Sequence, residues 1–554
     1  MARQAKAAPD SHVRAAAGRY LRFGRDAALR NLPPLFENSR NQTSPSGAKE
    51  RFSQNPAIIT LSSKALKKSP QPRTLRSMMS ACEIRVPLRH GAEFEFEAHS
   101  MNRRIYPIAR ALLIVAAILS LADNASAEWK EKVLYSFQGG NDGAVPAGGV
   151  VFDKEGNLYG ATSDGGAAND GTVFELRAPA KPGDAWTESV LYIFRGYNSG
   201  ADGASPEGGL VIDKAGNLYG TTGYGGNGPC TLLGSPTGCG TVYEISPPTA
   251  ESATWTETIL YNFQGGKDGQ FPIGDLTFDS VGNLYGATSF GGGYGSCDSP
   301  YYQHCGTIFE LVAPKKKGGK WKEKLLYSFR SGRDGANPNG GLVFDSKGAL
   351  YGTTYFGGNE VPVCKNNAGG TGCGLVFELS PPVSMDTAWQ ASVLYRFESY
   401  ANDGEFPVAG LIFDREGILY GTTTGGGRHF EGVVFSLTPP RKKGASWVEA
   451  LILQFNIHDG ALPRGGLTLD STGKLYGVAR AGRRPGGVVF QLIRQPGNNW
   501  VHSLLYNLAG PPDGKWPDAS LVLGEDGGLY GTTTTGGTGQ ECQGGCGTVF
   551  EVRP

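Results

Sequence analysis

The sequence predicts an all-β fold over residues 128–554, a seven-bladed β-propeller of four-stranded antiparallel blades. Three observations predict it. A motif of the form W-x-E-x-x-L-Y-x-F recurs, with drift, seven times at a spacing of 53 to 69 residues. Each copy holds four short runs rich in Val, Leu, Tyr, Phe and Thr, separated by turn-forming residues, as is typical of strands joined by turns. Glycine numbers 84 residues, about 15% of the chain, which favours many tight turns over long helices.

Each copy has the same order of elements. It opens with the tryptophan strand, and seven of the eight tryptophans mark the copies: Trp129, Trp186, Trp255, Trp321, Trp389, Trp447 and Trp500. An Asp-Gly turn and a Pro follow, for example Asp142 and Pro146. Three further strands then carry the motifs G-L-x-x-D, L-Y-G-T-T and G-T-V-F-E-L. The strands are apolar on both faces, as expected for sheets that are covered on both sides.

The ends of the repeat region predict how the ring closes. By analogy with other propellers, G-L-x-x-D is the innermost strand and the tryptophan strand the outermost. The region begins with a tryptophan strand, residues 129–137, and ends within the third strand of the last copy, residues 549–552. We therefore expect the N-terminal strand to complete the blade that the C-terminus begins. The alternative is an open β-solenoid, although its rungs are usually shorter than these repeats.

The segments before residue 128 have a different character. Residues 101–127 match a secretory signal peptide, with a basic start, an apolar run and a small-residue cleavage site at Ala125-Ser126-Ala127. An uncleaved membrane anchor is the alternative. Residues 1–100 lack sustained periodicity and are rich in Arg, Pro and Ser, so we expect them to be disordered, or not translated at all if Met101 is the true start.

The charge distribution limits the partners. Residues 128–554 hold 32 Lys and Arg against 42 Asp and Glu, a net-acidic body without a basic stripe, which argues against nucleic acid. We expect a secreted, periplasmic or cell-surface monomer that contacts the membrane only through its signal peptide. The expected partner is a glycan or an extracellular protein, and we expect no cofactor.

The repeat G-G-L-x-x-D-x-x-G-N-L-Y-G-T-T-x-x-G-G-x-x-x-x-G-T-V-F-E-L resembles that of the bacterial GloVer tandem-repeat proteins. The resemblance covers essentially all of residues 129–554. It implies an exported repeat protein of the cell surface, and members of that family carry different anchoring tails. This chain departs from the pattern because it ends inside a strand motif at Val552-Arg553-Pro554. The resemblance implies no particular chemistry.

Eight of the nine cysteines fall in one structural slot, the loop between the second and third strands. Recurrence at one slot in an exported chain predicts disulfides within the copies. The predicted pairs are Cys230 with Cys239, Cys297 with Cys305, Cys364 with Cys373, and Cys542 with Cys546. A metal site is the alternative, but only His304 lies nearby as a further ligand, and we expect no metal.

The loops that carry these cysteines are the predicted binding region. From the Tyr of L-Y-G to the Gly that opens the third strand, the seven copies span 12, 21, 21, 23, 12, 11 and 17 residues. The second to fourth copies therefore raise long, braced loops on one face, where aromatic side chains suit a glycan or protein partner. The candidates are Tyr224, Phe290, Tyr294, Tyr301, Tyr302, Tyr355 and Phe356, with Trp516 in the last copy. The alternative is that these loops only cap the blades.

Residues present in every copy more often serve the fold than a single active site. This applies to the Asp of the Asp-Gly turn, for which turn capping is favoured over calcium binding. Catalysis would come instead from departures from the repeat near the channel. The candidates are Asp275, Asp518 and His458, with Trp516, Arg464 and Glu405 in the neighbouring turns, and no spacing links them.

Two functions follow. The leading hypothesis is an exported binding or scaffolding module for a glycan or protein partner at the bacterial cell envelope, more consistent with a non-enzyme. The alternative is a lyase or hydrolase that acts on a glycan or lactone in the central channel, which rests on fold analogy alone.

Overall fold

The computed structural model describes residues 83–87, 93–97, 128–181, 183–196, 202–232, 235–250, 252–293, 297, 305–316, 318–358, 364, 372–384, 388–398, 402–442 and 444–554. Pro33–Ala127 form a unit separate from Glu128–Pro554. In the first unit, β1 (Glu83–Pro87) pairs with β2 (Glu93–Glu97) in an antiparallel hairpin. The predicted extension and signal peptide otherwise lie outside the described residues. No helix in the described ranges is long and apolar enough to span a bilayer.

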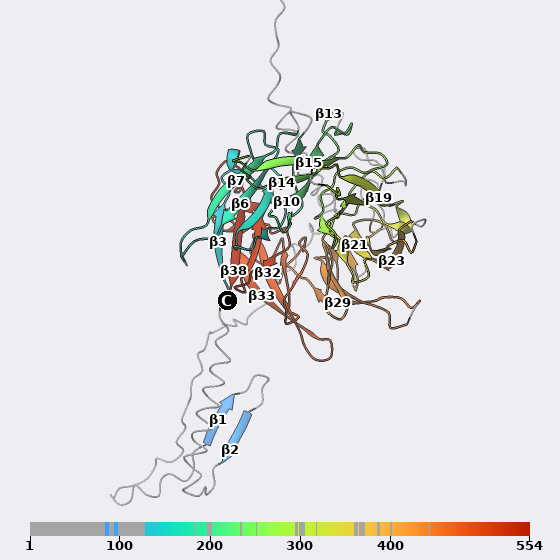
Figure 1. The fold of residues 1–554 in the computed structure, drawn as a ribbon. Helices are drawn as coiled ribbons and strands as arrows, with labels where there is room; N and C mark the ends of the chain where they lie inside the picture. The colour runs from blue at the N-terminus through green and yellow to red at the C-terminus, as the bar shows by residue number, and fades with distance from the viewer. Residues whose placement is uncertain are drawn as a thin grey trace, which may run out of the picture. The chain divides into compact units, whose positions relative to one another are not determined.

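Within the described part of residues 128–554, seven four-stranded antiparallel sheets form the predicted propeller (Figure 1). The strands of each blade are given from the innermost outwards. Blade 1 is β4 (Val151–Phe152), β5 (Leu158–Thr162), β6 (Thr172–Arg177) and β7 (Thr187–Ile193), and blade 2 is β9 (Val211–Ile212), β10 (Leu218–Thr222), β14 (Thr241–Ser246) and β15 (Thr256–Asn262). Blade 3 is β16 (Thr277–Phe278), β17 (Leu284–Thr288), β18 (Thr307–Val312) and β19 (Lys322–Ser328). Blades 4 and 5 are β20 (Val343–Phe344), β21 (Leu350–Thr354), β22 (Leu375–Ser380), β23 (Gln390–Arg396); and β25 (Ile412–Phe413), β26 (Leu419–Thr423), β28 (Val433–Thr438), β29 (Val448–Gln454). Blade 6 is β30 (Thr468–Leu469), β31 (Leu475–Ala479), β32 (Gly487–Arg494), β33 (Trp500–Leu508).

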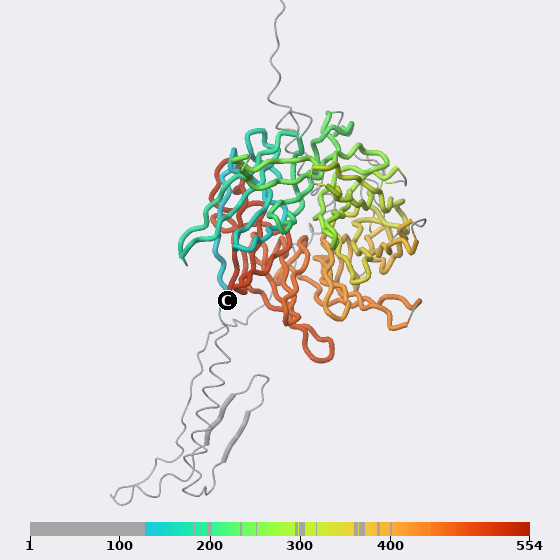
Figure 2. The backbone as a smooth tube through the Cα atoms, viewed as in Figure 1, coloured from blue at the N-terminus to red at the C-terminus, as the bar shows by residue number. Residues whose placement is uncertain are grey.

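Blade 7 closes the ring with strands from both ends of the unit. It consists of β35 (Val522–Leu523), β36 (Leu529–Thr533), β38 (Thr548–Arg553) and, outermost, β3 (Lys130–Ser136). β3 pairs antiparallel with β38, from Lys130 opposite Arg553 to Ser136 opposite Thr548. Figure 2 shows this strand, in cyan, beside the red C-terminal strands. The predicted closure is confirmed, and the open solenoid is excluded.

Short elements connect the blades on one face. Two-residue strand pairs join each of three links to the loop after the second strand: β8 (Gly203–Ala204) with β11 (Tyr224–Gly225), β24 (Gly404–Glu405) with β27 (Gly425–Gly426), and β34 (Gly514–Lys515) with β37 (Thr535–Gly536). The remaining elements are the hairpin β12 (Thr231–Leu232) with β13 (Ser235–Pro236) and the 3-10 turns η1 (Gly140–Asp142) and η2 (Gly332–Asp334).

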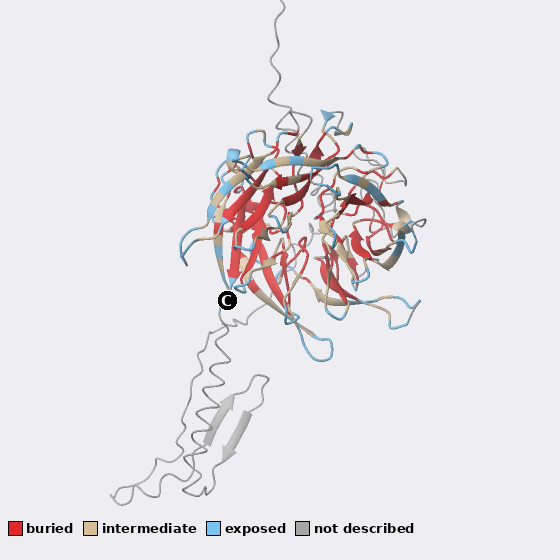
Figure 3. Cartoon of the chain, in the orientation of Figure 1, coloured by how far each residue is buried: buried red, intermediate tan, exposed pale blue. Residues whose placement is uncertain are grey.

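The seams between blades contain the core, and the repeated aromatics build it. Each motif tryptophan packs on the L-Y-G tyrosine of the preceding blade, as Trp255 does on Tyr159, with ring centroids 6.1 Å apart. A second contact joins the phenylalanine after the outer strand to the third strand of the next blade, such as Phe263 to Phe309 at 5.2 Å. Such tilted and edge-on ring contacts add to apolar burial. Figure 3 shows the buried residues concentrated in the strands.

The glycine of L-Y-G is required by this packing. A Cβ at Gly160 would lie 2.5 Å from the Phe174 ring, and one at Gly352 would lie 2.7 Å from the Phe377 ring. The third-strand phenylalanine thus lies directly against the glycine of the second strand. The motif residues Trp, Tyr, Gly and Phe are therefore one packing unit, which explains why they recur together.

Candidate functional site

The Asp of each Asp-Gly turn is held where one blade passes to the next. Asp202 accepts hydrogen bonds from the Tyr192 hydroxyl at 3.1 Å and from the backbone N–H groups of Arg195 and Gly203 at 2.9 and 2.7 Å. Tyrosine hydroxyls donate in the same way to Asp142, Asp268, Asp334, Asp403 and Asp513. This geometry fits the turn-capping interpretation of the repeated Asp, because its oxygens satisfy turn donors.

A second carboxyl group faces this Asp across five of the described seams. It belongs to the Glu of W-x-E, and the pairs are Glu131 with Asp513, Glu188 with Asp142, Glu257 with Asp202, Glu323 with Asp268, and Glu449 with Asp403. Burial, and then the charge of the Asp, raises the pKa of Glu131 and Glu257 to about 8 and of the other three to about 7. Because these pairs repeat around the rim, we assign them to the fold.

Seven residues with left-handed backbone surround the opening of the central channel. Each stands directly before the Pro of a link, between the Asp-Gly turn and the innermost strand. They are Val145, Ser205, Phe271, Asn337, Phe406, Leu462 and Trp516, with φ values of 57°, 54°, 60°, 57°, 59°, 56° and 63°. We call this end of the innermost strands the channel mouth.

Main-chain hydrogen bonds fix this conformation. The N–H of Phe406 donates to the carbonyl of Cys373 in blade 4 at 2.8 Å, and its own carbonyl accepts from Thr424 of blade 5 at 3.1 Å. The residue therefore joins two blades through its backbone. Glycine would make the same bonds without strain, whereas another residue in this conformation costs roughly 1–2 kcal/mol. The backbone thus explains the conformation, and some of the side chains make contacts of their own, such as Asn337 Nδ2, which donates to the Ser289 carbonyl at 2.8 Å.

Aromatic and basic side chains gather at the mouth over three consecutive seams. Tyr355 follows the second strand of blade 4 and stacks on Phe406, with ring centroids 5.1 Å apart and planes 23° apart. Burial raises the pKa of Tyr355 to about 12, while the positive charge of Arg464 opposes that rise and the charge of Glu405 adds to it. Arg464, in the link to blade 6, is only 9% exposed.

The arrangement continues at the seam between blades 6 and 7. The Arg480 guanidinium lies over the Trp516 ring at 4.6 Å from its centroid, and the Lys515 ammonium lies 4.3 Å from the same centroid. Nε of Arg480 is 3.7 Å from Oδ1 of Asp518, whose side chain is 4% exposed. Such cation–π contacts hold a planar guanidinium in place. We name Tyr355, Phe406, Arg464, Arg480, Trp516 and Asp518 the mouth arc.

Next to the mouth, neighbouring blades approach each other closely at a ring built mainly from glycine backbone. Its members precede the innermost strands: Gly149, Gly209, Asp275, Gly341, Gly410, Gly466 and Ser520. The two side chains in this ring bond to their neighbours. Asp275 Oδ1 accepts from the Gly209 N–H at 2.6 Å, and Ser520 Oγ accepts from the Gly466 N–H at 2.9 Å.

The predicted catalytic residues lie on three different seams. Asp275 is exposed and bonds across the seam between blades 2 and 3, whereas Asp518 is buried beside Arg480 between blades 6 and 7. His458 is exposed in an Asp-Gly turn at the rim between blades 5 and 6. Their catalytic role therefore stays a prediction.

The predicted binding aromatics separate into two groups. The expected exposure of Tyr224 and Phe356 was wrong, because they are 4% and 8% exposed and pack against Phe271 and Phe406 respectively. Phe290, Tyr355 and Trp516 are partly accessible. Tyr294, Tyr301 and Tyr302 lie outside the described residues. The hollow beside Tyr224 has a volume of only about 20 Å³, far below the roughly 300 Å³ at which ligand pockets begin.

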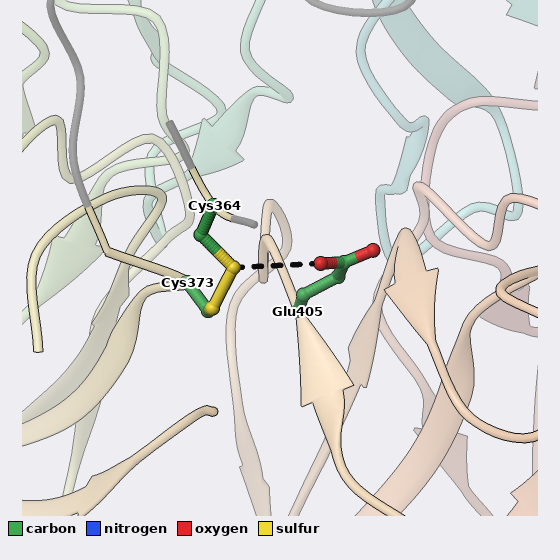
Figure 4. Close-up of side chains that lie close together, drawn as sticks. All are labelled: Cys364, Cys373 and Glu405. Atoms are coloured by element: carbon green, nitrogen blue, oxygen red, sulfur yellow. Dashed lines mark hydrogen bonds between the residues drawn. A yellow bond between two sulfur atoms is a disulfide. The ribbon is translucent and has the colours of Figure 1, made fainter. Parts of the chain in front are cut away.

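All four predicted disulfides are confirmed: Cys230–Cys239, Cys297–Cys305, Cys364–Cys373 and Cys542–Cys546. Beside the third, the Glu405 carboxylate points at the sulfurs, with Oε2 3.5 Å from Sγ of Cys364 (Figure 4). Gln270 stands in the equivalent position beside Cys230. Because the disulfide occupies both thiols, we assign this trio to bracing the loop.

Sequence reasoning missed Arg480, although a signal existed. The position follows L-Y-G-T-T, and across the seven copies it is occupied by Ser163, Gly223, Ser289, Tyr355, Thr424, Arg480 and Thr534. Small or hydroxyl residues fill five of these positions, so Arg480 and Tyr355 are the two departures. Comparing the copies position by position would have identified both.

A family model described as the Gloeobacter/Verrucomicrobia repeat matches residues 123–359 and 230–490. No curated protein matches the chain.

Solved structures show only distant similarity. The PQQ domain of pyranose dehydrogenase from Coprinopsis cinerea is 10% identical over 78% of this chain and 97% of its own, with a TM-score of 0.37. The soluble aldose sugar dehydrogenase from Escherichia coli is 12% identical over 77% and 99%, with a TM-score of 0.37. The extracellular domain of a one-component system from B. thetaiotaomicron is 12% identical over 76% and 41%, with a TM-score of 0.43.

Proposed function

The chain belongs to the Gloeobacter/Verrucomicrobia repeat family, and from that premise we propose that it is an exported propeller that binds a glycan at its channel mouth. Export is supported by the four disulfides, which persist in oxidising compartments, and by the apolar segment within residues 101–127. The proposed place of action is the bacterial cell envelope or its surroundings.

The choice of the channel mouth as the site rests on one observation. The seven left-handed positions hold seven side chains where glycine would avoid backbone strain, in a chain that uses glycine at many other positive-φ positions. Those side chains also differ from copy to copy more than the rim residues do. Ser205 and Asn337 are buried, so the partly exposed members of the set, Phe406 and Trp516 among them, are the ones that support a ligand site at the mouth.

The nature of the side chains favours a glycan. Phe406, Tyr355 and Trp516 offer ring faces, while Arg464 and Arg480 offer planar donors beside them. Aromatic walls with a few convergent polar groups are the usual composition of a small-molecule site. Sugar rings match this composition, since their C–H faces pack on aromatic rings and their hydroxyls accept hydrogen bonds.

The test is a glycan-array screen of the full chain, followed by calorimetric titration of the glycans that bind. We expect Trp516→Ala and Phe406→Ala to weaken binding at least tenfold. The matched control is Phe430→Ala, because Phe430 is 60% exposed in a loop of blade 5 and belongs to none of the mouth positions. Unchanged binding in both mouth variants would exclude the mouth as the site, and the absence of any bound glycan would exclude the function.

A further inference from the structure

Blade 6 is a basic region within an acidic propeller. Residues 456–494, from its entering link to the end of its third strand, hold six basic residues (Arg464, Lys474, Arg480, Arg483, Arg484 and Arg494) and two acidic ones (Asp459 and Asp470). Over residues 128–554 the ratio is reversed, at 32 basic to 42 acidic. Arg464 and Arg480 place two of these charges at the channel mouth, where a low-dielectric wall strengthens their field.

The Arg480 side chain is held before any ligand arrives. Its guanidinium is fixed between the Trp516 ring, 4.6 Å away, and Asp518, at 3.7 Å from Nε. That separation from Asp518 exceeds hydrogen-bond length, so the two groups attract without a direct hydrogen bond. The side chain is 13% exposed, and its backbone N–H donates to the Leu462 carbonyl at 3.2 Å. A partly accessible, oriented guanidinium is suited to bind a planar anion through paired N–H donors.

Arg464 and Arg480 lie on either side of the hairpin that the two inner strands of blade 6 form. Arg464 precedes β30, and Arg480 directly follows β31, the strand that pairs with β30. The antiparallel pairing therefore brings both to the mouth of one blade, with Tyr355 and Phe406 on one side and Trp516 on the other. Two cationic donors thus lie between two aromatic surfaces.

Resting on the proposed function, we propose that the mouth arc selects oligosaccharides that carry carboxylate groups, that is, uronic-acid residues. Arg464 and Arg480 bind the carboxylates, and Trp516 with the Tyr355–Phe406 pair contacts the sugar faces. A carboxylate on a six-membered ring presents an anion and an apolar face together, which is the combination that this arc offers. A neutral sugar would bring no carboxylate to the arginines.

The experiment compares charged and neutral forms of the same oligosaccharide. Titration calorimetry of the full chain uses hexamers of galacturonate, mannuronate and guluronate, each as the free acid and as the full methyl ester. At least one free acid is expected to bind, at least tenfold more tightly than its ester, and the affinity is expected to fall as salt is raised. Inorganic phosphate, as competitor, tests whether any small anion suffices.

The variants Arg464→Gln and Arg480→Gln remove one charge each and are expected to weaken binding of the free acid at least tenfold, while binding of the ester stays within twofold. Arg480→Lys keeps the charge but loses the planar donors, so we expect an intermediate loss. The matched control is Arg415→Gln, which removes an exposed charge from the hairpin at the opposite end of blade 5. Thermal melting of each variant verifies that the fold is retained.

The outcomes separate the two proposals. Free acids that bind no better than their esters, or equal affinities for the Arg480→Gln and Arg415→Gln variants, overturn the selection of carboxylates. If neutral glycans bind at the mouth in that case, the proposed function stands alone. Displacement of the oligosaccharide by millimolar phosphate overturns the specificity for a sugar carboxylate. Binding of neither charged nor neutral glycans overturns both proposals.

Discussion

Blade 2 and blade 6 follow the same repeat but differ at both ends of their seams. At the rim of blade 2, Tyr192 and Glu257 surround Asp202, and a disulfide braces the loop on the mouth face. At the rim of blade 6, Leu453 and His502 replace the Tyr and the Glu, and its short loop has no cysteine. At the mouth, blade 2 presents Ser205 and Gly223, whereas blade 6 presents Leu462, Arg464 and Arg480.

The fold compensates for the departures of blade 6. Asn456 takes the place of the missing tyrosine, donating to Asp459 from its side chain at 2.6 Å and from its backbone at 2.8 Å. The turn is thus retained with different residues, and the blade remains in the ring. The comparison teaches that a copy of the repeat can change residues wherever the same donors and acceptors are satisfied. Single copies can therefore acquire side chains that serve a function.

The largest expected effect comes from removing the pairing of β3 with β38, which closes the ring that holds blades 2 and 6. Deletion of residues 129–137 removes β3, leaving β38 with an unpaired edge and Trp129 absent from its contact with Tyr476. We expect loss of the cooperative melting transition, measured by circular dichroism. A single sharp transition near that of the full chain would refute the role of ring closure.

Removing the brace of blade 2 should have the next largest effect. Replacing Cys230 and Cys239 together by Ser opens a loop of about ten residues and should lower the free energy of unfolding by about 2–3 kcal/mol. Urea denaturation measures this. Since blade 6 has no such brace, its mouth positions should keep their ligand affinity in this variant, and a loss of affinity would contradict the separation of the two regions.

The rim carboxyl pairs predict a dependence of stability on pH. The folded-state pKa of Glu257 is raised to about 8, above the value near 4.5 of an unfolded chain, so the native state retains a proton that the unfolded state has lost. The stability contributed by this proton is full below about pH 4.5 and is lost as pH rises towards 8. Melting temperatures should therefore fall across that range.

Two variants sharpen this prediction, one at the rim of blade 2 and one at the rim of blade 6. Glu257→Gln keeps a neutral polar group at the rim of blade 2, so the decline with pH should become shallower. His502→Glu should create a sixth carboxyl pair opposite Asp459 and make it steeper. Parallel curves for both variants and the unmodified chain would show that these pairs do not control the pH dependence.

The smallest expected effect concerns the left-handed positions. In Val145→Gly, the relief of roughly 1–2 kcal/mol of backbone strain offsets the lost side chain, so the free energy of unfolding should change by less than about 1 kcal/mol. The control Val151→Gly, in the extended strand β4, has no strain to relieve and should be clearly destabilised. Equal destabilisation of both variants would refute the claim of strain.

Much of the fold could be predicted from the sequence because its contacts are made by repeated residues. The Trp strands, the L-Y-G step and the cysteine pairs recur at one position per copy, so register, closure and disulfides followed from their order. The site could not be predicted in this way, since it is made by residues that do not recur. Arg464 and Arg480 are 16 positions apart in the sequence, and only the pairing of β30 with β31 brings both to the mouth.

The burial of Tyr224 and Phe356 shows a second limit. Both stand at the start of the loop after the second strand, where the sequence suggested surface exposure. Both are covered by the aromatic residue at the left-handed position of the next link, Phe271 or Phe406. A contact between residues about 50 positions apart leaves no local trace in the sequence. Composition of a loop therefore does not establish exposure of its aromatic residues.

The pairing of β3 with β38 also determines how the propeller would respond to mechanical force. In this antiparallel pair, Lys130 lies opposite Arg553, so both ends of the unit leave the ring at the same corner. Tension applied between those ends would peel the hydrogen bonds apart one after another rather than shear them together. The ring should accordingly open at low force, and a protein tethered through both ends would act as a clasp that yields before its blades unfold.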